Sequence, residues 1–192
     1  MSETIRYNAT TAELADEQAV IEAAKVNPQK FTVIYEVYYE KIFRFIYQRM
    51  DDKKYAFDTT QQVFLKVLDN LHKYEYRGVP FSSWLYRIAS NEITNLFRQQ
   101  KTQRTINIDT VNVYTIIEEI QESKIEQYHD KIVRIISEEL EEDELQLIEM
   151  RFFEKRSFKE IAEILDITEN NAKVKTYRIL EKLKKSINNF PS

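Results

Sequence analysis

Residues 73–98, KYEYRGVPFSSWLYRIASNEITNLFR, hold the only glycine of the chain, its only tryptophan and one of its three prolines. The segment Arg-Gly-Val-Pro at 77–80 indicates a turn, because glycine accepts a positive φ and proline fixes its own φ. Ser82 or Ser83 is then predicted to cap a new helix by accepting a hydrogen bond from a free first-turn amide.

The predicted helix has two faces. Apolar residues at helical spacing predict a core face made of Leu85, Ile88, Ala89, Ile93 and Leu96. Cations and amides recur on another side, at Arg87, Asn91, Asn95 and Arg98, and the preceding loop brings the aromatic residues Tyr74, Tyr76, Phe81 and Trp84. Cations neutralise phosphates, amides read base edges and rings stack on bases, so the segment predicts a nucleic-acid site. The alternative is that the rings belong to the core and the polar face is only solvated.

The amino-acid sequence of this segment resembles that of a known protein family. WLYRIASNEITNLFR after RGVPFSS is similar to the promoter −10-reading segment of bacterial sigma factors of the extracytoplasmic-function (ECF) group, a part of the sigma-70 family. The matching positions are Tyr76, Arg77, Gly78, Phe81, Trp84, Leu85, Tyr86, Arg87, Ile88, Ala89 and Asn91. The resemblance implies −10 DNA contacts, with a flipped base, from Arg77, Phe81, Ser82, Trp84, Arg87, Asn91, Asn95 and Arg98.

Three helices are predicted before this segment, at about 12–26, 29–50 and 54–72, with breaks at Asn27-Pro28 and Asp51-Asp52. The second is so rich in aromatic residues that it is expected to be mostly buried. In the third, spacing turns Val63, Phe64, Val67, Leu68 and Leu71 inward. DTTQQVFLKVLDNL at 58–71 resembles the sigma segment that docks on the β′ clamp helices of core RNA polymerase. The resemblance implies polymerase contacts from Asp58, Gln61, Gln62, Leu65 and Lys66.

The C-terminal part predicts a helix-turn-helix. A helix is expected at 141–153, Ser157 and Glu160 form a capping box, and Thr168 can cap a last helix at 169–186. RFFEKRSFKEIAEILDITENNAKVKTYRILEKLKK at 151–185 resembles the −35-reading domain of the same family. The resemblance implies duplex contacts from Ser157, Asn170, Asn171, Lys173, Lys175, Thr176 and Arg178, and a further contact with the polymerase β flap.

Three groups of residues depart from the usual pattern of that domain. Lys155 and Arg156 stand where the family usually has glycine and an apolar residue. Ala172 and Thr176 replace the usual valine and leucine, and 179–181 lack the basic residues often found there. These departures weaken a residue-by-residue transfer of −35 contacts, whereas the fold prediction depends on the capping box and the apolar positions.

Composition and charge support two helical domains. The chain has 192 residues, 31% of them charged, and a net charge of −4. Residues 69–104 and 150–192 are basic, with six basic against three acidic and ten against six, whereas 105–149 carry three against thirteen. We therefore predict an all-α chain with two small domains joined by an acidic linker. Its parts are a flexible extension (1–16), a region 2-like domain (17–102), the linker (103–127) and a region 4-like domain (128–192).

The chemistry of a cofactor or an active site is not expected. The chain has no cysteine, two isolated histidines and one glycine, which argues against thiolate metal sites and glycine-rich phosphate loops. No apolar run could span a bilayer and no leader is present, so the cytoplasm is the expected location. We therefore predict no cofactor and no metal.

The prediction that follows is a non-catalytic sigma factor that binds core RNA polymerase and promoter DNA. The resemblance also implies an anti-sigma factor as a partner, through which the chain could be tethered to a membrane without inserting in it. The main alternative is a stand-alone regulator whose helix-turn-helix binds duplex DNA without polymerase. A helical hydrolase is a third and weaker alternative, since paired carboxylates such as Glu141 and Glu142 diverge on a helix.

Overall fold

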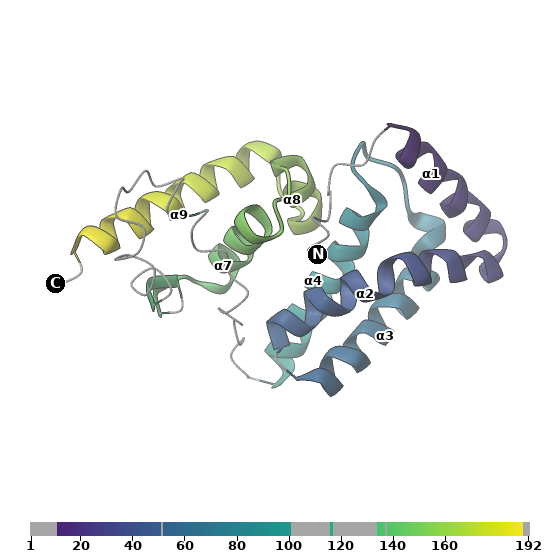
Figure 1. Ribbon diagram of the computed structural model, residues 1–192, viewed down its shortest axis with the longest axis horizontal. Helices are drawn as coiled ribbons and strands as arrows, with labels where there is room; N and C mark the ends of the chain where they lie inside the picture. The colour runs from purple at the N-terminus through teal and green to yellow at the C-terminus, as the bar shows by residue number, and fades with distance from the viewer. Residues whose placement is uncertain (1–10, 51, 101–115, 117–133, 137, 190–192) are drawn as a thin grey trace, which may run out of the picture. The chain divides into compact units, whose positions relative to one another are not determined.

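The computed structural model describes residues 11–50, 52–100, 116, 134–136 and 138–189. The chain divides into two compact units, the first made of residues 1–105 with 163–166 and the second of residues 106–162 with 167–192. Every element of regular structure among the described residues is helical (Figure 1), which confirms the all-α prediction. The predicted linker, apart from residue 116, and the bounds at 102 and 127 lie outside the described residues.

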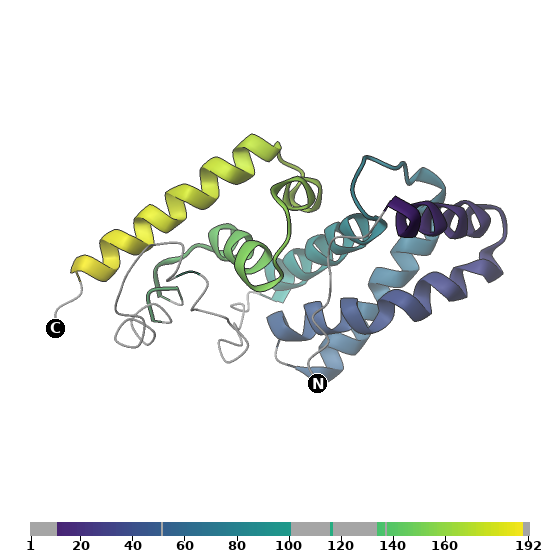
Figure 2. The same ribbon diagram turned by 45° about the horizontal axis from the view of Figure 1, so that its top comes forward.

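The first unit is a helical bundle whose centre is α2. Asn27 and Asp52 mark the two breaks, and each side chain accepts a hydrogen bond from a following amide, that of Gln29 at 3.0 Å and that of Tyr55 at 2.9 Å. Both predicted breaks are thereby confirmed. Figures 1 and 2 show α2 beside both α3 and α4. The elements are α1 (Thr11–Val26), a 3₁₀ turn (Pro28–Lys30), α2 (Phe31–Met50), α3 (Lys53–Asn70), a second 3₁₀ turn (Leu71–Lys73) and α4 (Phe81–Gln100).

Two expectations about these helices need correction. Helix α1 begins at Thr11, so residues 11–16, assigned above to an extension, are helical. Helix α2 is not mostly buried, because only one side of it meets the core and Val33 and Val37 are exposed. Its aromatic residues instead form a ladder along the helix, in which consecutive ring centroids lie 5.1, 6.2 and 5.9 Å apart, made of Tyr35, Tyr39, Phe43 and Tyr47. Leu68 of α3, predicted inside, is partly exposed.

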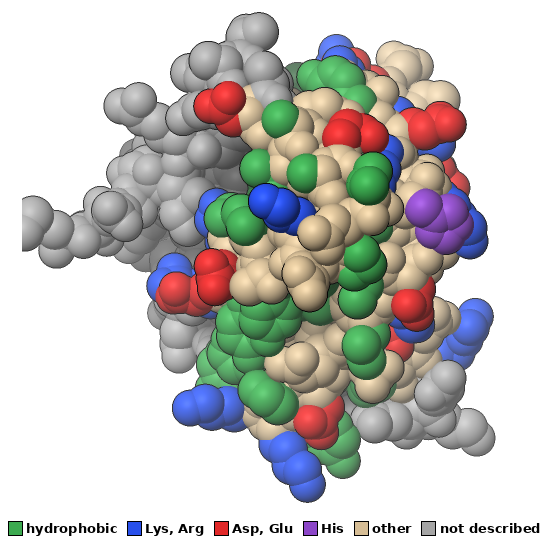
Figure 3. All heavy atoms as spheres, turned by 90° about the vertical axis from the view of Figure 1, so that its right-hand side faces the viewer, with side chains coloured by type: hydrophobic (Ala, Val, Ile, Leu, Met, Phe, Trp, Pro, Cys, Tyr) green, Lys and Arg blue, Asp and Glu red, His purple; other side chains and the backbone are tan. Residues whose placement is uncertain are grey.

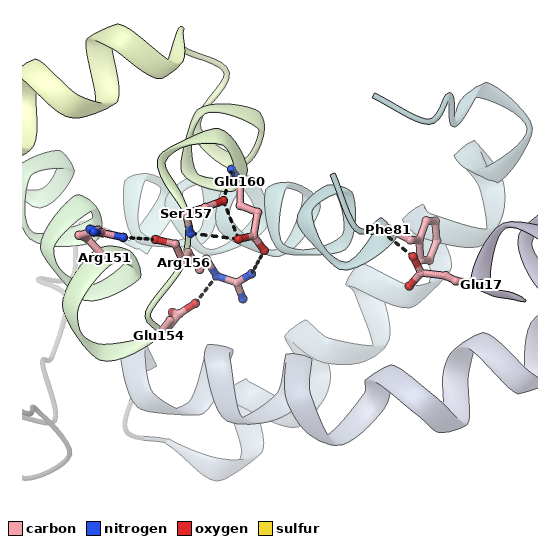
Figure 4. Close-up of polar contacts among 7 residues, drawn as sticks. All are labelled: Glu17, Phe81, Arg151, Glu154, Arg156, Ser157 and Glu160. Carbon is pink, nitrogen blue, oxygen red and sulfur yellow. Dashed lines mark hydrogen bonds and ion pairs between the residues drawn. The ribbon is translucent and has the colours of Figure 1, made fainter. Parts of the chain in front are cut away.

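The start of α4 also differs from the prediction. The helix begins at Phe81, so Ser82 and Ser83 lie within its first turn rather than at its cap, and Ser83 is buried. The free amide of Phe81 donates to a carboxylate oxygen of Glu17 on α1, at 3.1 Å (Figure 4). A negative charge is favourable at this end of a helix because of the helix dipole. The cap therefore comes from another helix, 64 positions away in the sequence.

Helix α1 holds the loop before α4 at both ends. Besides the Glu17 contact, Lys25 donates to the carbonyl oxygen of Tyr74 at 2.8 Å. The hydroxyl of Tyr38 on α2 donates to the other oxygen of Glu17. Burial, reinforced by the Glu17 carboxylate, raises the pKa of Tyr38 above the ordinary 10.0, so this hydroxyl stays a donor wherever the carboxylate is ionised.

We expect Glu17→Ala to lower the free energy of unfolding by about 1–2 kcal/mol, because it leaves the Phe81 amide and the Tyr38 hydroxyl without their acceptor. Urea unfolding followed by the fluorescence of Trp84 measures this. Glu22→Ala is the matched control on the same helix, since Glu22 makes only exposed contacts with Gln18 and Lys25. An equal effect of the two changes would contradict the assigned cap.

The second unit contains the predicted helix-turn-helix. Glu160 accepts from the amide and hydroxyl of Ser157, at 3.0 and 2.8 Å, and its own amide donates to the Ser157 hydroxyl oxygen, which confirms the capping box. Thr168 accepts from the amide of Asn171 at 3.2 Å and caps the last helix as predicted. The elements are α7 (Glu142–Ile148), a π-helical turn (Glu149–Phe153), α8 (Phe158–Leu165) and α9 (Glu169–Asn189).

The two residues before the capping box occupy special positions. Lys155 has φ of 53°, in the left-handed region where the family's usual glycine would fit without a side-chain penalty. Arg156 is fully buried, and its Nε atom lies 2.6 Å from Glu154 while a terminal nitrogen lies 3.8 Å from Glu160 (Figure 4). A charged side chain therefore fills a core position, and two carboxylates neutralise it.

Candidate nucleic-acid interface

A cleft lies in the first unit between the end of α3, the loop before α4 and one face of α4. Its volume is about 420 Å³. It is lined by cations, amides and one aromatic ring, which is the chemistry that a single nucleic-acid strand requires. The lining residues are Lys66, Asn70, Lys73, Arg77, Trp84, Arg87, Ile88, Asn91, Glu92 and Asn95.

Five of the predicted −10 residues meet in this cleft: Arg77, Trp84, Arg87, Asn91 and Asn95. Arg77 belongs to the loop before α4, and the other four residues lie on three successive turns of α4. The helical spacing that predicted a common face for Arg87, Asn91 and Asn95 explains why these three side chains line the same cleft. Arg98 is exposed on α4 and donates to Asn95 at 2.9 Å, beyond the lining itself. Ser82 is half-buried and does not line the cleft.

The predicted contact from Phe81 is wrong in this conformation. The ring is 0% exposed and packs against Tyr74 and Trp84, with centroids 4.9 and 5.5 Å away, so no base can reach it. Tyr74 is buried as well, and burial raises the pKa of its phenol. The two buried rings support Trp84, whose centroid lies 5.3 Å from that of Tyr74, and Trp84 remains accessible from the cleft.

Sequence reasoning missed the contribution of α3 and its following turn. Lys66, Asn70 and Lys73 recur at helical spacing, but only the packing of α3 against α4 brings them to the cleft. Lys66 was predicted to contact polymerase, whereas its ammonium group pairs with Glu92 of α4. Ile88, predicted as core, is half-buried and forms part of the wall.

The other residues predicted to contact polymerase lie on α3. Asp58 and Gln62 are exposed, and the side chain of Leu65 is 54% exposed. Gln61 is half-buried and donates to the hydroxyl of Tyr35 at 3.2 Å. Figure 3 shows one face of this unit, on which apolar side chains gather between isolated charges.

The predicted −35 residues lie mostly on the open side of α9. Asn170, Asn171, Lys173 and Arg178 are exposed, and Lys175 is half-exposed, near Asp143 at 3.7 Å. The prediction for Thr176 is wrong: it is 1% exposed, and its hydroxyl donates to the carbonyl oxygen of Ala172 at 2.8 Å.

The capping box limits what Ser157 can do. Ser157 is exposed, but its hydroxyl proton is committed to Glu160, so its oxygen can only accept. A phosphate presents only acceptors, and therefore this hydroxyl has no proton to offer it in the described conformation.

A basic aromatic cluster on the second unit was not predicted. The guanidinium carbon of Arg151 lies 4.6 Å from the centre of the Phe158 ring, and Lys173 Nζ lies 5.9 Å from it. The ring of Tyr177, which is exposed on α9, lies 6.4 Å away. The four-residue spacing of Lys173 and Tyr177 on one helix could have predicted that these two side chains are neighbours. The approach of Arg151 could not be predicted in this way, because it depends on the π-helical turn.

The described residues contain no group of three or more metal-ligating side chains. None of the helices that the structure describes is long and apolar enough to cross a membrane.

Comparison with known proteins agrees with the two units. The sigma-70 region 2 model matches residues 34–103 and the sigma-70 region 4 model matches residues 132–183, which together cover more than half of the chain. Among curated proteins, the chain is similar to the ECF RNA polymerase sigma factors SigX and SigM of Bacillus subtilis. SigX is 26% identical over 82% of this chain and 83% of its own length, and SigM 25% over 79% and 91%.

A solved structure shares the fold. It is that of CnrH in complex with the cytosolic domain of CnrY, with a TM-score of 0.55, 15% identity, and coverage of 90% of this chain and 97% of that one. The predictions of fold and family are thereby confirmed. The chain belongs to the ECF group of the sigma-70 family, the sigma factors that direct RNA polymerase to promoters.

Proposed function

We propose that the cleft of the first unit holds the non-template strand of the promoter −10 element. The observation that carries this proposal is the meeting of Arg77, Arg87 and two asparagines with Trp84 in one cleft. Cations can follow the phosphates, the amides of Asn91 and Asn95 can bond base edges, and the indole can stack on a base flipped out of the duplex.

The exposed side of α9 is proposed to read the −35 element as duplex. Asn170 and Asn171 stand at its first turn, where a recognition helix meets base edges in a major groove, and Lys173 and Arg178 can contact phosphates. Neutralising phosphates makes such binding weaker as salt rises.

The outer face of α3 is proposed to bind the β′ clamp helices of core RNA polymerase. Asp58, Gln62 and the exposed Leu65 offer polar groups around an apolar centre, which is the usual anatomy of a protein interface. The second unit would contact the β flap, as the family resemblance implies.

The same resemblance supports an anti-sigma factor as the regulator of this chain in the cytoplasm. Such a partner could hold the chain near a membrane and would cover the polymerase and DNA surfaces. The chain itself would act without catalysis, as a subunit that positions polymerase and stabilises open promoter DNA.

The test is assembly with core RNA polymerase. We expect the chain to co-elute with core enzyme in gel filtration and to direct transcription from specific start sites in a genomic promoter library, with activity falling as salt rises. If the chain fails to bind polymerase but shifts duplex DNA by itself, the stand-alone regulator is correct and the −10 assignments fail.

A further inference from the structure

One carboxylate stands among the cations of the cleft. Glu92 lines it together with Lys66, Lys73, Arg77 and Arg87, one turn of α4 away from Asn95. Its side chain is 18% exposed, and one of its oxygens is paired with the ammonium group of Lys66. An acid in a site for a polyanion opposes binding unless it is neutralised or has its own ligand.

The ion pair accounts for the charge but not for the position of Glu92. The Lys66 side chain is 49% exposed, so the pair is partly solvated, and such pairs contribute little to stability. Only one oxygen of Glu92 is engaged by a hydrogen bond within the described part of the chain. A carboxylate with an oxygen left over in a base-reading cleft is an acceptor for an amino group of the ligand.

We propose that Glu92 is a specificity-determining residue that selects bases carrying an exocyclic amino group, cytosine, adenine or guanine, against thymine at one position of the −10 strand. A carboxylate oxygen can accept a hydrogen bond from the amino group of any of these three bases, whereas thymine has no amino group and its exocyclic oxygens are acceptors. The positive charge of Lys66 offsets the repulsion between this carboxylate and a phosphate. The proposal rests on the proposed function of the cleft.

The test uses holoenzyme reconstituted with core polymerase and promoter DNA that carries a pre-melted −10 region. Each unpaired position is varied among the four bases, and the dissociation constant is measured for the parent chain and for Glu92→Gln. Glutamine keeps the shape but offers both a donor and an acceptor. Glu40→Gln is the matched control, since Glu40 lies exposed on α2 and pairs only with Arg44 in the described contacts.

We expect the parent chain to prefer a base with an amino group, cytosine, adenine or guanine, over thymine at one position by about fivefold to tenfold, which is the lower part of the range for a good base contact. Glu92→Gln should reduce that preference to less than about twofold and leave the other positions unchanged. Glu40→Gln should keep the full preference. Lys66→Met should weaken binding of all four bases about equally, because it leaves the carboxylate unneutralised.

The proposal is overturned if Glu92→Gln retains the preference at every position, or if it changes the affinity for all bases by one common factor. If the cleft does not bind the −10 strand at all, the result is different: the dissociation constant of holoenzyme would then be the same for all four bases at every position of the melted strand. Far-ultraviolet circular dichroism of each variant verifies that the helices remain.

Discussion

Trp84→Ala should lower the rate of promoter opening by about tenfold to a hundredfold while core-polymerase affinity stays within about twofold. Stacking of a base on an aromatic side chain is worth about 1–3 kcal/mol by alanine substitution. Trp84 is the ring of the Tyr74–Phe81–Trp84 cluster that lines the cleft. Opening is measured with a fluorescent base analogue in the −10 region, and core affinity by titration against labelled polymerase.

Two further variants separate stacking from folding. Trp84→Phe keeps a ring over Tyr74 and Phe81 and should retain most of the opening rate. Leu65→Asp should have the opposite pattern to Trp84→Ala, in which polymerase binding is weak. The reason is that the change places a charge at the apolar centre of the α3 face. If Trp84→Ala and Leu65→Asp impair the same step, the cleft and the α3 face do not have the separate roles proposed here.

Arg156→Ala should destabilise the second unit by about 3–5 kcal/mol, because removal of one partner leaves buried carboxylates uncompensated. Arg156 is fully buried against Glu154 and Glu160. The only tryptophan, Trp84, belongs to the first unit, so its fluorescence reports that unit alone. Circular dichroism in urea should therefore show an early loss of helix while the fluorescence transition stays in place.

The controls distinguish a buried pair from a surface one. Arg178→Ala, on the exposed side of α9, should change stability by less than about 0.5 kcal/mol. Arg156→Met together with Glu154→Gln should recover part of the loss, since an apolar side chain of similar length fills the position and one of the two carboxylates is removed. A cost below about 1 kcal/mol for Arg156→Ala would contradict the role of the pair.

Local patterns were sufficient for the helices and for half of the cleft. Helical spacing placed Arg87, Asn91 and Asn95 on one face of α4, and the capping box predicted the start of α8. Spacing could not tell which side of a helix another helix covers. For this reason Phe81 and Thr176 were assigned to DNA although both are buried, and the contribution of Lys66 to the cleft was not predicted.

The remaining errors concern groups that meet across long distances in the sequence. A serine next to a turn is a good local cap, but the amide of Phe81 donates its hydrogen bond to a carboxylate on α1 instead. Arg156 was noted in the sequence only as a departure from the family pattern, because nothing in its immediate neighbourhood predicts that Glu154 and Glu160 both pair with it. Both outcomes depend on tertiary contacts that no short window contains.

The contacts of α1 bear on how this protein can be divided into fragments. The region 2 match begins at residue 34, so a fragment cut to that boundary would look complete by homology. It would nevertheless lack Glu17 and Lys25, which hold the first amide of α4 and the backbone of Tyr74. Such a fragment would keep every side chain that lines the cleft, but it would lose the two contacts from α1 that hold the loop before α4 in place. Dissection of this domain should therefore start no later than Thr11.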